Sequence, residues 1–133
     1  MSRLILATAI VLTGSIVTTS LLAQEMRSVS VNTVGTKEVR IAIHSNFDDN
    51  DCSGKQKPGI DIKSNPKNGS VSVKNGVEKV NRPASACHGK SVPGKAVFYK
   101  AKSGFKGKDS VKYSILGSGG KVLFTINATI TVK

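Results

Sequence analysis

The C-terminal stretch gives the clearest signal in the pattern of hydrophobic and polar positions. Between positions 122 and 132 apolar residues occupy every second position, namely Val122, Phe124, Ile126, Ala128, Ile130 and Val132. Polar side chains fill the positions between them, with Leu123 as the only apolar exception. A period of two places alternate side chains on opposite faces, so the pattern predicts one long β-strand with one face in a core.

A second strand with the same pattern precedes it. Val111, Tyr113 and Ile115 alternate with polar residues, and the sequence Gly-Ser-Gly-Gly at 117–120 joins the two runs. Glycine-rich connections between alternating runs are typical of β-hairpins. We therefore expect residues 111–132 to form the nucleus of an all-β domain.

Shorter alternating runs predict more strands upstream. They cover residues 27–34, 38–44, 60–62, 71–73, 77–80 and a run that begins at Val97 and Tyr99. The dipeptide Asn75-Gly76 is the strongest short hairpin signal in the chain, and we expect a turn there. Residues 45–59 and 81–94 are expected to be long loops. Seven or eight short strands with frequent turns indicate a β-sandwich or a small barrel.

The first 23 residues have the plan of a secretory signal peptide. Arg3 precedes an apolar run from Leu4 to Val17, and small and polar residues follow up to Ala23. This order of charged, apolar and small residues predicts cleavage between Ala23 and Gln24. An uncleaved membrane anchor is the alternative, but the apolar run is short and interrupted. Residues 24–133 then form one exported domain, periplasmic or secreted, that is not an integral membrane protein.

The chain is strongly basic, with a formal net charge of +12, or +11 once Arg3 is removed. From Lys90 to Lys112 there are seven lysines and one aspartate. A basic balance of this size favours association with polyanions and says little about the fold. Few aromatic residues flank the lysines to stack on bases, which disfavours nucleic acid as the partner.

Residues 99–115 resemble a known class of domains. Their motif is Y-x4-GF-x-G-x-D-x-V-x-Y-x-I, and it is carried by Tyr99, Gly104, Phe105, Gly107, Asp109, Val111, Tyr113 and Ile115. It is similar to the end of the bacterial immunoglobulin-like and cadherin-like domains that occur in tandem in surface proteins. Pro66, Gly69 and Val71 also match the P-x-x-G-x-V strand entry of that family. The chain departs from the family at Ala101, where a proline is usual.

The resemblance implies an immunoglobulin-like sandwich and a structural role for each residue of the motif. Gly104 and Gly107 would allow backbone angles that a side chain forbids, and Phe105 would plug the core below the turn. Asp109 would accept hydrogen bonds from turn N–H groups. Tyr113 has the spacing of a tyrosine corner, in which the phenol bonds to nearby backbone. None of these roles is catalytic.

Cys52 and Cys87 are the only cysteines, and both lie in expected loops. In an oxidising compartment two cysteines most simply form one bridge. Closing a loop of this length stabilises a domain by roughly 3–4 kcal/mol on the chain-entropy estimate. In the comparison with immunoglobulin domains Ile115 occupies the place of the second intersheet cysteine, so the expected bridge is a different one. It would pin two loops together at one end of the domain.

Four lysines flank the turn that contains Gly104, and they are the candidate functional residues. Lys100, Lys102, Lys106 and Lys108 would lie around one end of a sandwich. Such a basic loop end is suited to phosphate-rich polymers, acidic glycans or anionic lipid headgroups. The alternative is that these lysines serve solubility and protect exposed strand edges.

Metal and catalytic chemistry have weaker support. Asp49, Asp51 and Ser53, followed by Gly54, open like a calcium loop, but the twelfth position holds Ile60 instead of a bidentate glutamate. We rank calcium below a solvated acidic turn. His44 and His88, the only imidazoles, have neither copper nor zinc spacing with the cysteines and are expected to be exposed in loops. No serine stands in a nucleophile motif.

These observations predict an exported, disulfide-bonded, immunoglobulin-like β-sandwich of about seven or eight strands, without a cofactor. The expected function is a non-enzymatic binding or structural module whose basic loop end contacts an anionic polymer or envelope component. A calcium-dependent adhesion module is the first alternative. An enzyme is the second, and it would need a cleft of converging polar groups that the sequence does not reveal. A sheet edge is available to a protein partner, but no pattern names that partner.

Overall fold

A computed structural model describes residues 24–54 and 57–133 of the chain. The elements are β1 (Met26–Thr33), β2 (Val39–Ser45), β3 (Gly59–Ser64), β4 (Gly69–Lys79), β5 (Ser91–Ala101), β6 (Gly107–Leu116), the short 3-10 helix η1 (Ser118–Gly120) and β7 (Val122–Val132). The expected signal segment, residues 1–23, lies outside the described residues. Within the described ranges no helix is long and apolar enough to cross a membrane.

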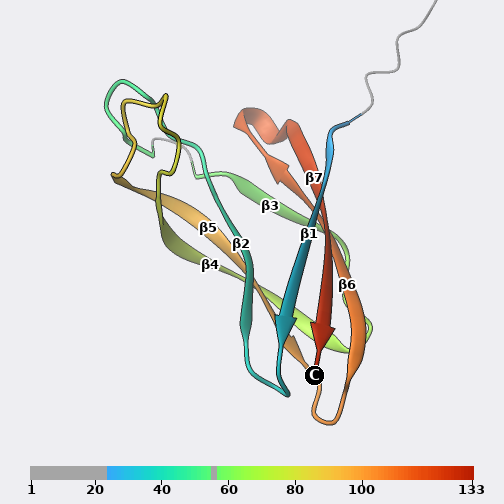
Figure 1. Cartoon of the computed structure of the whole chain (residues 1–133). Helices are drawn as coiled ribbons and strands as arrows, with labels where there is room; N and C mark the ends of the chain where they lie inside the picture. The colour runs from blue at the N-terminus through green and yellow to red at the C-terminus, as the bar shows by residue number, and fades with distance from the viewer. Residues whose placement is uncertain (1–23, 55–56) are drawn as a thin grey trace, which may run out of the picture.

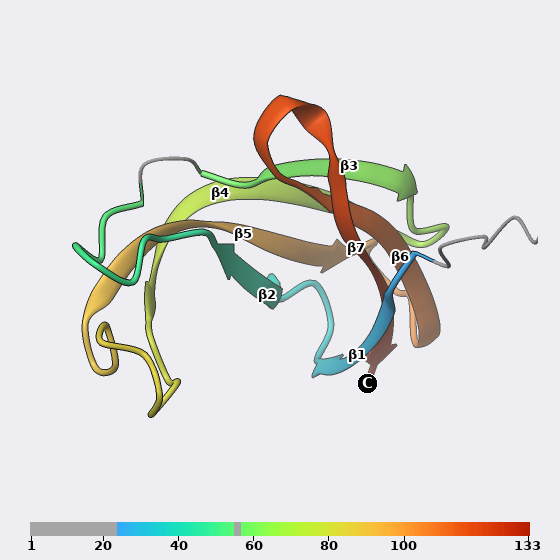
Figure 2. The same ribbon diagram turned by 90° about the horizontal axis from the view of Figure 1, so that it is seen from above.

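The strands form two sheets that pack face to face (Figures 1 and 2). One sheet has the order β1-β7-β6-β3, and the other has the order β2-β5-β4. All neighbouring strands are antiparallel except β1 and β7, which run parallel. The prediction of an all-β sandwich is confirmed, with seven strands in the described chain.

The strand order follows the immunoglobulin plan. When the strands are lettered in chain order, β2, β5 and β4 correspond to B, E and D, while β3, β6 and β7 correspond to C, F and G. These are the two groups that lie in separate sheets of a constant-type immunoglobulin domain. The first strand differs, because β1 joins the sheet of β6 and β7 instead of pairing with β2.

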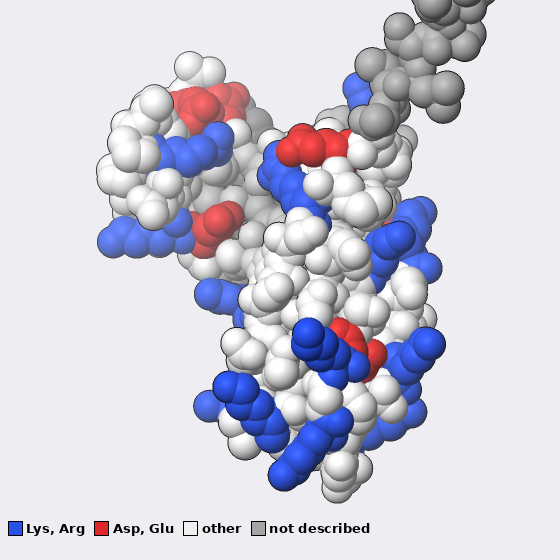
Figure 3. All heavy atoms as spheres, turned by 45° about the vertical axis from the view of Figure 1, so that its right-hand side comes forward, with Lys and Arg blue, Asp and Glu red and all other residues white. Residues whose placement is uncertain are grey.

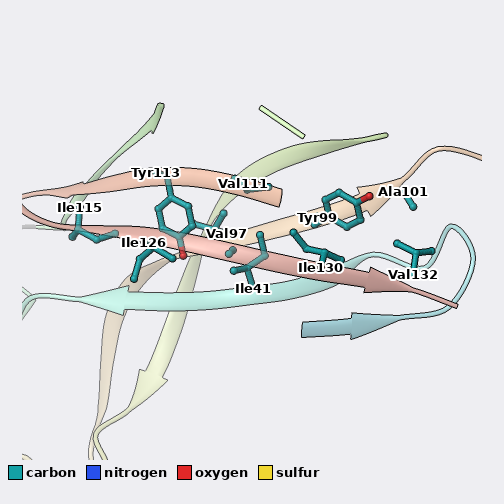
Figure 4. Close-up of a cluster of buried hydrophobic side chains, with 11 residues drawn as sticks. Ile41, Val97, Tyr99, Ala101, Val111, Tyr113, Ile115, Ile126, Ile130 and Val132 are labelled. Carbon is teal, nitrogen blue, oxygen red and sulfur yellow. The ribbon is translucent and has the colours of Figure 1, made fainter. Parts of the chain in front are cut away.

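The core lies between the sheets and is built from alternate residues of four strands (Figure 4). Its buried members are Ile41 from β2, Val97, Tyr99 and Ala101 from β5, Val111, Tyr113 and Ile115 from β6, and Ile126, Ala128, Ile130 and Val132 from β7. The alternation predicted for residues 111–132 therefore matches the buried face. Leu123, the exception in the pattern, is 46% exposed.

The predicted turn at Asn75-Gly76 is wrong. β4 runs without interruption through both residues, and Gly76 pairs with Gly94 of β5. A Cβ at Gly76 would lie 2.9 Å from Cδ1 of Ile43, so this glycine makes room for a neighbouring side chain. Packing between strands has overridden the local preference of the dipeptide for a turn.

The second expected loop, residues 81–94, is shorter than predicted because β5 already begins at Ser91. Pro93 lies inside this strand, where it pairs with Val77 of β4. The pairing of β2 with β5 ends at Gly94, so Pro93 has a strand neighbour on one side only. A proline lacks a backbone N–H and is tolerated in a sheet at such edge positions.

Cys52 and Cys87 form a disulfide, as predicted. The bond joins the loop after β2 to the loop after β4, and together these loops (residues 46–54 and 81–90) are called the disulfide lobe below. Cys87 forms a small buried cluster with Val80 and Val92 at the base of the lobe, and Phe47 and Cys52 pack against it. A disulfide is compatible with an oxidising, extracytoplasmic compartment.

Candidate functional site

Asp109 organises the turns at the end of the sandwich where β5 passes to β6. Its carboxylate accepts hydrogen bonds from the backbone N–H groups of Lys67 (3.0 Å), Asn68 (2.9 Å) and Ser110 (3.0 Å). The hydroxyl of Tyr99 donates to Oδ2 of Asp109 at 3.0 Å. The carboxylate therefore ties the turn between β3 and β4 to the start of β6.

The electrostatics of Asp109 follow from these contacts. Burial by itself raises the pKa of the carboxyl, but the N–H groups of Asn68, Lys67 and Ser110 and the Tyr99 hydroxyl outweigh it, so the pKa lies below its ordinary value. Burial raises the pKa of Tyr99 to about 12, with help from the hydrogen bond to Asp109 and from its charge. Asp109 is thus a buried anion held by four donors.

The turn that follows β5 has the positive φ angles that its glycines predict. Gly104 has φ +81° and Gly107 has φ +129°, both in the region that favours glycine. Phe105 is half-buried and packs against the main core, beneath the turn. The N–H of Lys102 donates to the carbonyl of Asn68 at 2.8 Å, which fixes this turn to the one between β3 and β4.

Seven exposed lysines occupy this end of the sandwich, which we call the basic end. Four are the predicted ones, and the turns of the fold add three more: Lys37, Lys67, Lys100, Lys102, Lys106, Lys108 and Lys133. Long-range contacts bring the added three here. Gly107 pairs with Val132, the N–H of Gly35 donates to the carbonyl of Lys133 at 3.1 Å, and the N–H of Lys67 donates to Asp109. Sequence spacing alone did not reveal them.

The lysines surround the basic end instead of forming one flat patch. Lys100 lies on the outer side of β5, since the flanking residues Tyr99 and Ala101 are buried. Lys108 lies on the outer side of β6, in the opposite sheet, beside the buried Asp109. Figure 3 shows basic side chains on several sides of the lower end, whereas most acidic ones in this view lie in the upper half.

Tyr113 is buried as expected of a corner residue, but the partner of its hydroxyl differs from the prediction. The hydroxyl bonds to Nε2 of His44 at 2.9 Å instead of to backbone. The tyrosine whose hydroxyl approaches a backbone carbonyl is Tyr99, which lies 3.4 Å from the oxygen of Asn68. The predicted bond from the Tyr113 hydroxyl to backbone is therefore wrong. The hydroxyl bonds instead to a side chain of the facing sheet.

His44 is not the exposed loop residue that was predicted. It lies in β2 and is partly buried, and its ring meets that of Tyr113 edge-on with centroids 5.6 Å apart. A register shift between Arg40 and Ala42 marks a bulge, which exchanges the faces of the residues that follow. Burial, together with the charge of Arg27, lowers the pKa of His44 to about 4. His88, in contrast, is exposed in a loop.

The acidic loop after β2 uses its carboxylates in local hydrogen bonds. Oδ1 of Asp49 accepts from the hydroxyl of Ser85 at 2.5 Å, and Oδ1 of Asp51 accepts from both the N–H and the hydroxyl of Ser53. Within the described residues no group of three or more histidine, cysteine or acidic side chains is placed to share a metal ion. The weak calcium candidate at Asp49, Asp51 and Ser53 stays a prediction, and in this arrangement its two carboxylates accept hydrogen bonds from serine groups.

A cleft lies at the opposite end from the lysines, between the two sheets. The disulfide lobe and the β6–β7 hairpin diverge there (Figure 1), and the space between them has a volume of about 430 Å³. Arg27, His44 and Arg82 contribute polar groups, and Leu123 and Phe124 contribute apolar surface. Sequence analysis missed this site, because its residues come from five strands and the loops beside them, which only the fold brings together.

Comparison with known proteins identified no relative of this chain. No family model matches the chain, and the searches of curated proteins and of solved structures found no match either. The architecture that the chain demonstrates is an all-β sandwich of two sheets, consistent with the immunoglobulin-like class.

Proposed function

We propose that this protein is an exported, non-enzymatic member of the bacterial immunoglobulin-like and cadherin-like class, periplasmic or secreted, that binds an anionic polymer of the cell envelope through its basic end. The class assignment rests on the motif of residues 99–115 and on the strand order. The disulfide and the signal-like segment at 1–23 support export.

The observation that supports polymer binding is the convergence of seven exposed lysines on one end of the fold. The acidic groups nearby do not cancel this charge. Asp109 is buried and directed at backbone N–H groups, and Glu38 is paired with Lys74 at 2.5 Å. At physiological salt the screening length is about 8 Å, so clustered lysines act jointly on one polyanion.

The arrangement around the rim of the basic end suits a flexible chain better than a small planar ligand. Lysine is a compact point charge on a long stem and contacts phosphate or sulfate groups without strict geometry. A polymer that wraps the end would meet lysines of both sheets in turn. Affinity is then expected to fall steeply with salt, since each neutralised anionic group releases counterions.

Binding to polyphosphate and to heparin, measured by biolayer interferometry at low and physiological salt, tests the proposal. The double variant Lys102→Glu/Lys106→Glu should weaken binding by about tenfold or more, because it reverses two charges at the centre of the site. The matched control is Lys90→Glu/Lys121→Glu, which makes the same change in net charge at the other end. Lys63 and Lys74 are poorer controls, since both are ion-paired with carboxylates.

The control variant should retain most of the affinity at physiological salt. An equal loss in both double variants would show that net charge alone governs the association and would overturn the role of the basic end. Failure of the unmodified protein to bind either polymer would overturn polymer binding itself.

A further inference from the structure

The cleft has the size and the mixed lining of a small-molecule site. Its volume of about 430 Å³ falls within the usual range for ligand pockets, which are mostly apolar with a few converging polar groups. One wall comes from the four-stranded sheet, with Ile115, Leu123 and Phe124. The other comes from β2 and the disulfide lobe, with Ile43 and Phe47.

Two arginines are held at the cleft by aromatic rings. The guanidinium carbon of Arg27 lies 4.0 Å from the ring centroid of Phe124, and that of Arg82 lies 4.7 Å from the ring centroid of Phe47. A guanidinium stacked on a ring keeps its N–H edges available for hydrogen bonds while its orientation is restricted. The two groups come from opposite walls of the cleft.

His44 adds a third donor. Within the described chain no buried side-chain nitrogen or oxygen lacks a hydrogen-bond partner, and the His44 ring bonds to Tyr113 through Nε2 alone. Nδ1 therefore reaches solvent at the cleft that His44 lines. The buried Tyr113 hydroxyl bonds only to His44, and leaving its hydrogen without an acceptor would be costly. The hydroxyl therefore donates to Nε2, which accepts, and the proton of the neutral ring is on Nδ1.

The acidic groups near the cleft are engaged with other partners. Glu78 is the carboxylate in its lining, and it accepts a hydrogen bond from the hydroxyl of Ser45. Glu25 accepts from Nε of Arg27 at 2.8 Å, which uses one of the donors of that guanidinium. No hydrogen bond or ion pair within the described residues engages the guanidinium of Arg82, which is the most available cation of the site.

We propose that this cleft binds a small amphipathic anion, a molecule with a carboxylate, sulfonate or phosphate group on an apolar body. The acidic group accepts hydrogen bonds from Arg82, Arg27 and Nδ1 of His44, because all three are donors. The apolar body packs on Leu123 and Phe124. This site is separate from the basic end, and the proposal is independent of polymer binding.

Two fluorescent probes with the same ring system distinguish binding of the anionic group from packing of the apolar body. Anilinonaphthalene sulfonate carries the anion, and phenylnaphthylamine is the same body without it. The protein should bind the sulfonate with saturable, one-to-one stoichiometry. Arg82→Gln should lower the affinity for the sulfonate by about tenfold, the usual scale for a charge-assisted hydrogen bond. The affinity for phenylnaphthylamine should change by no more than about twofold.

Matched variants locate the effect. Arg40→Gln makes the same chemical change at an exposed position of β2 that is not part of the cleft lining, and it should leave both probes unchanged. Leu123→Ser removes apolar wall at a half-exposed position and should weaken both probes. Near-ultraviolet circular dichroism of each variant checks that the fold is retained.

Three results with the cleft variants and the unmodified protein would overturn the proposal, and a fourth comes from the basic end. The first three are an equal loss of sulfonate affinity in Arg82→Gln and Arg40→Gln, probe binding that Leu123→Ser does not alter, and the absence of saturable sulfonate binding by the unmodified protein. Loss of sulfonate binding in Lys102→Glu/Lys106→Glu, with Arg82→Gln unaffected, would place the probe at the basic end and would also reject the cleft.

Discussion

The hydroxyl of Tyr113 and Nε2 of His44 lie 2.9 Å apart and form a hydrogen bond that joins the two sheets. Tyr113 belongs to β6 and His44 to β2, the strands that correspond to F and B of the immunoglobulin plan. In antibody domains a conserved disulfide links those two strands. Here a hydrogen bond between side chains links them, and the disulfide joins two loops beyond the sheets instead.

A double-mutant cycle measures this cross-sheet bond. Tyr113→Phe removes the hydroxyl and should lower the free energy of unfolding by about 0.5–1.5 kcal/mol. In a His44→Leu background the same change should cost less, because the hydroxyl has already lost its partner. Urea denaturation of the four proteins gives the coupling energy. If the two changes add within about 0.3 kcal/mol, the bond does not couple the sheets.

Asp109→Asn tests the turn network at the basic end. The amide cannot satisfy all four donors that the carboxylate accepts, so the free energy of unfolding should fall by about 1–3 kcal/mol. Asp61→Asn is the matched control, since Asp61 is a partly exposed carboxylate paired with Lys63 and should cost at most about 1 kcal/mol. Similar losses in the two variants would mean that Asp109 does not organise the turns.

The pH dependence of the same variant has a defined sign. The pKa of Asp109 lies below the ordinary value of 3.8 in the folded protein. The stability that the carboxylate contributes is therefore complete above that value and is lost as the pH falls through the lower, folded pKa. Unfolding measured along an acid series should show the difference between the unmodified protein and Asp109→Asn shrinking below pH 3.8. A constant difference would contradict the depressed pKa.

His44 should remain neutral in the folded protein down to acidic pH. Its pKa is lowered from 6.5 to about 4, so between these values the unfolded chain binds a proton that the folded chain does not. Stability is therefore lost as the pH falls across this window. In a His88→Gln variant the remaining imidazole resonance should titrate in NMR with a midpoint near pH 4. A midpoint at 6.5 would show that the ring is solvated like that of a free histidine.

The strands that the sequence predicted best are those whose alternation continues over many residues against one core. β6 and β7 meet that condition, because every second residue from Val111 to Ile115 and from Ile126 to Val132 is buried. The sequence predicted two strands where β4 is one, because the dipeptide Asn75-Gly76 favours a turn. That local preference cannot reveal that Gly76 leaves room for the side chain of Ile43.

The candidate sites were less predictable for a different reason. The basic end was only partly found, because Lys37, Lys67 and Lys133 reach it through strand pairing and turn contacts rather than through nearness in the sequence. The cleft was not found at all, since a bulge in β2 redirects His44. A period-two count assigns that side chain to the other face, and nothing in the local pattern signals the inserted residue.

The parallel pairing of β1 with β7 has a mechanical consequence. The two strands are joined over eight paired positions, and they run in the same direction (Figure 1). A tensile load between the start of β1 and the end of β7 therefore acts along both strands and shears the whole ladder at once. An antiparallel hairpin pulled from its open end would instead unzip pair by pair. Force spectroscopy on the domain should accordingly show one high-force rupture, and gradual low-force extension would contradict it.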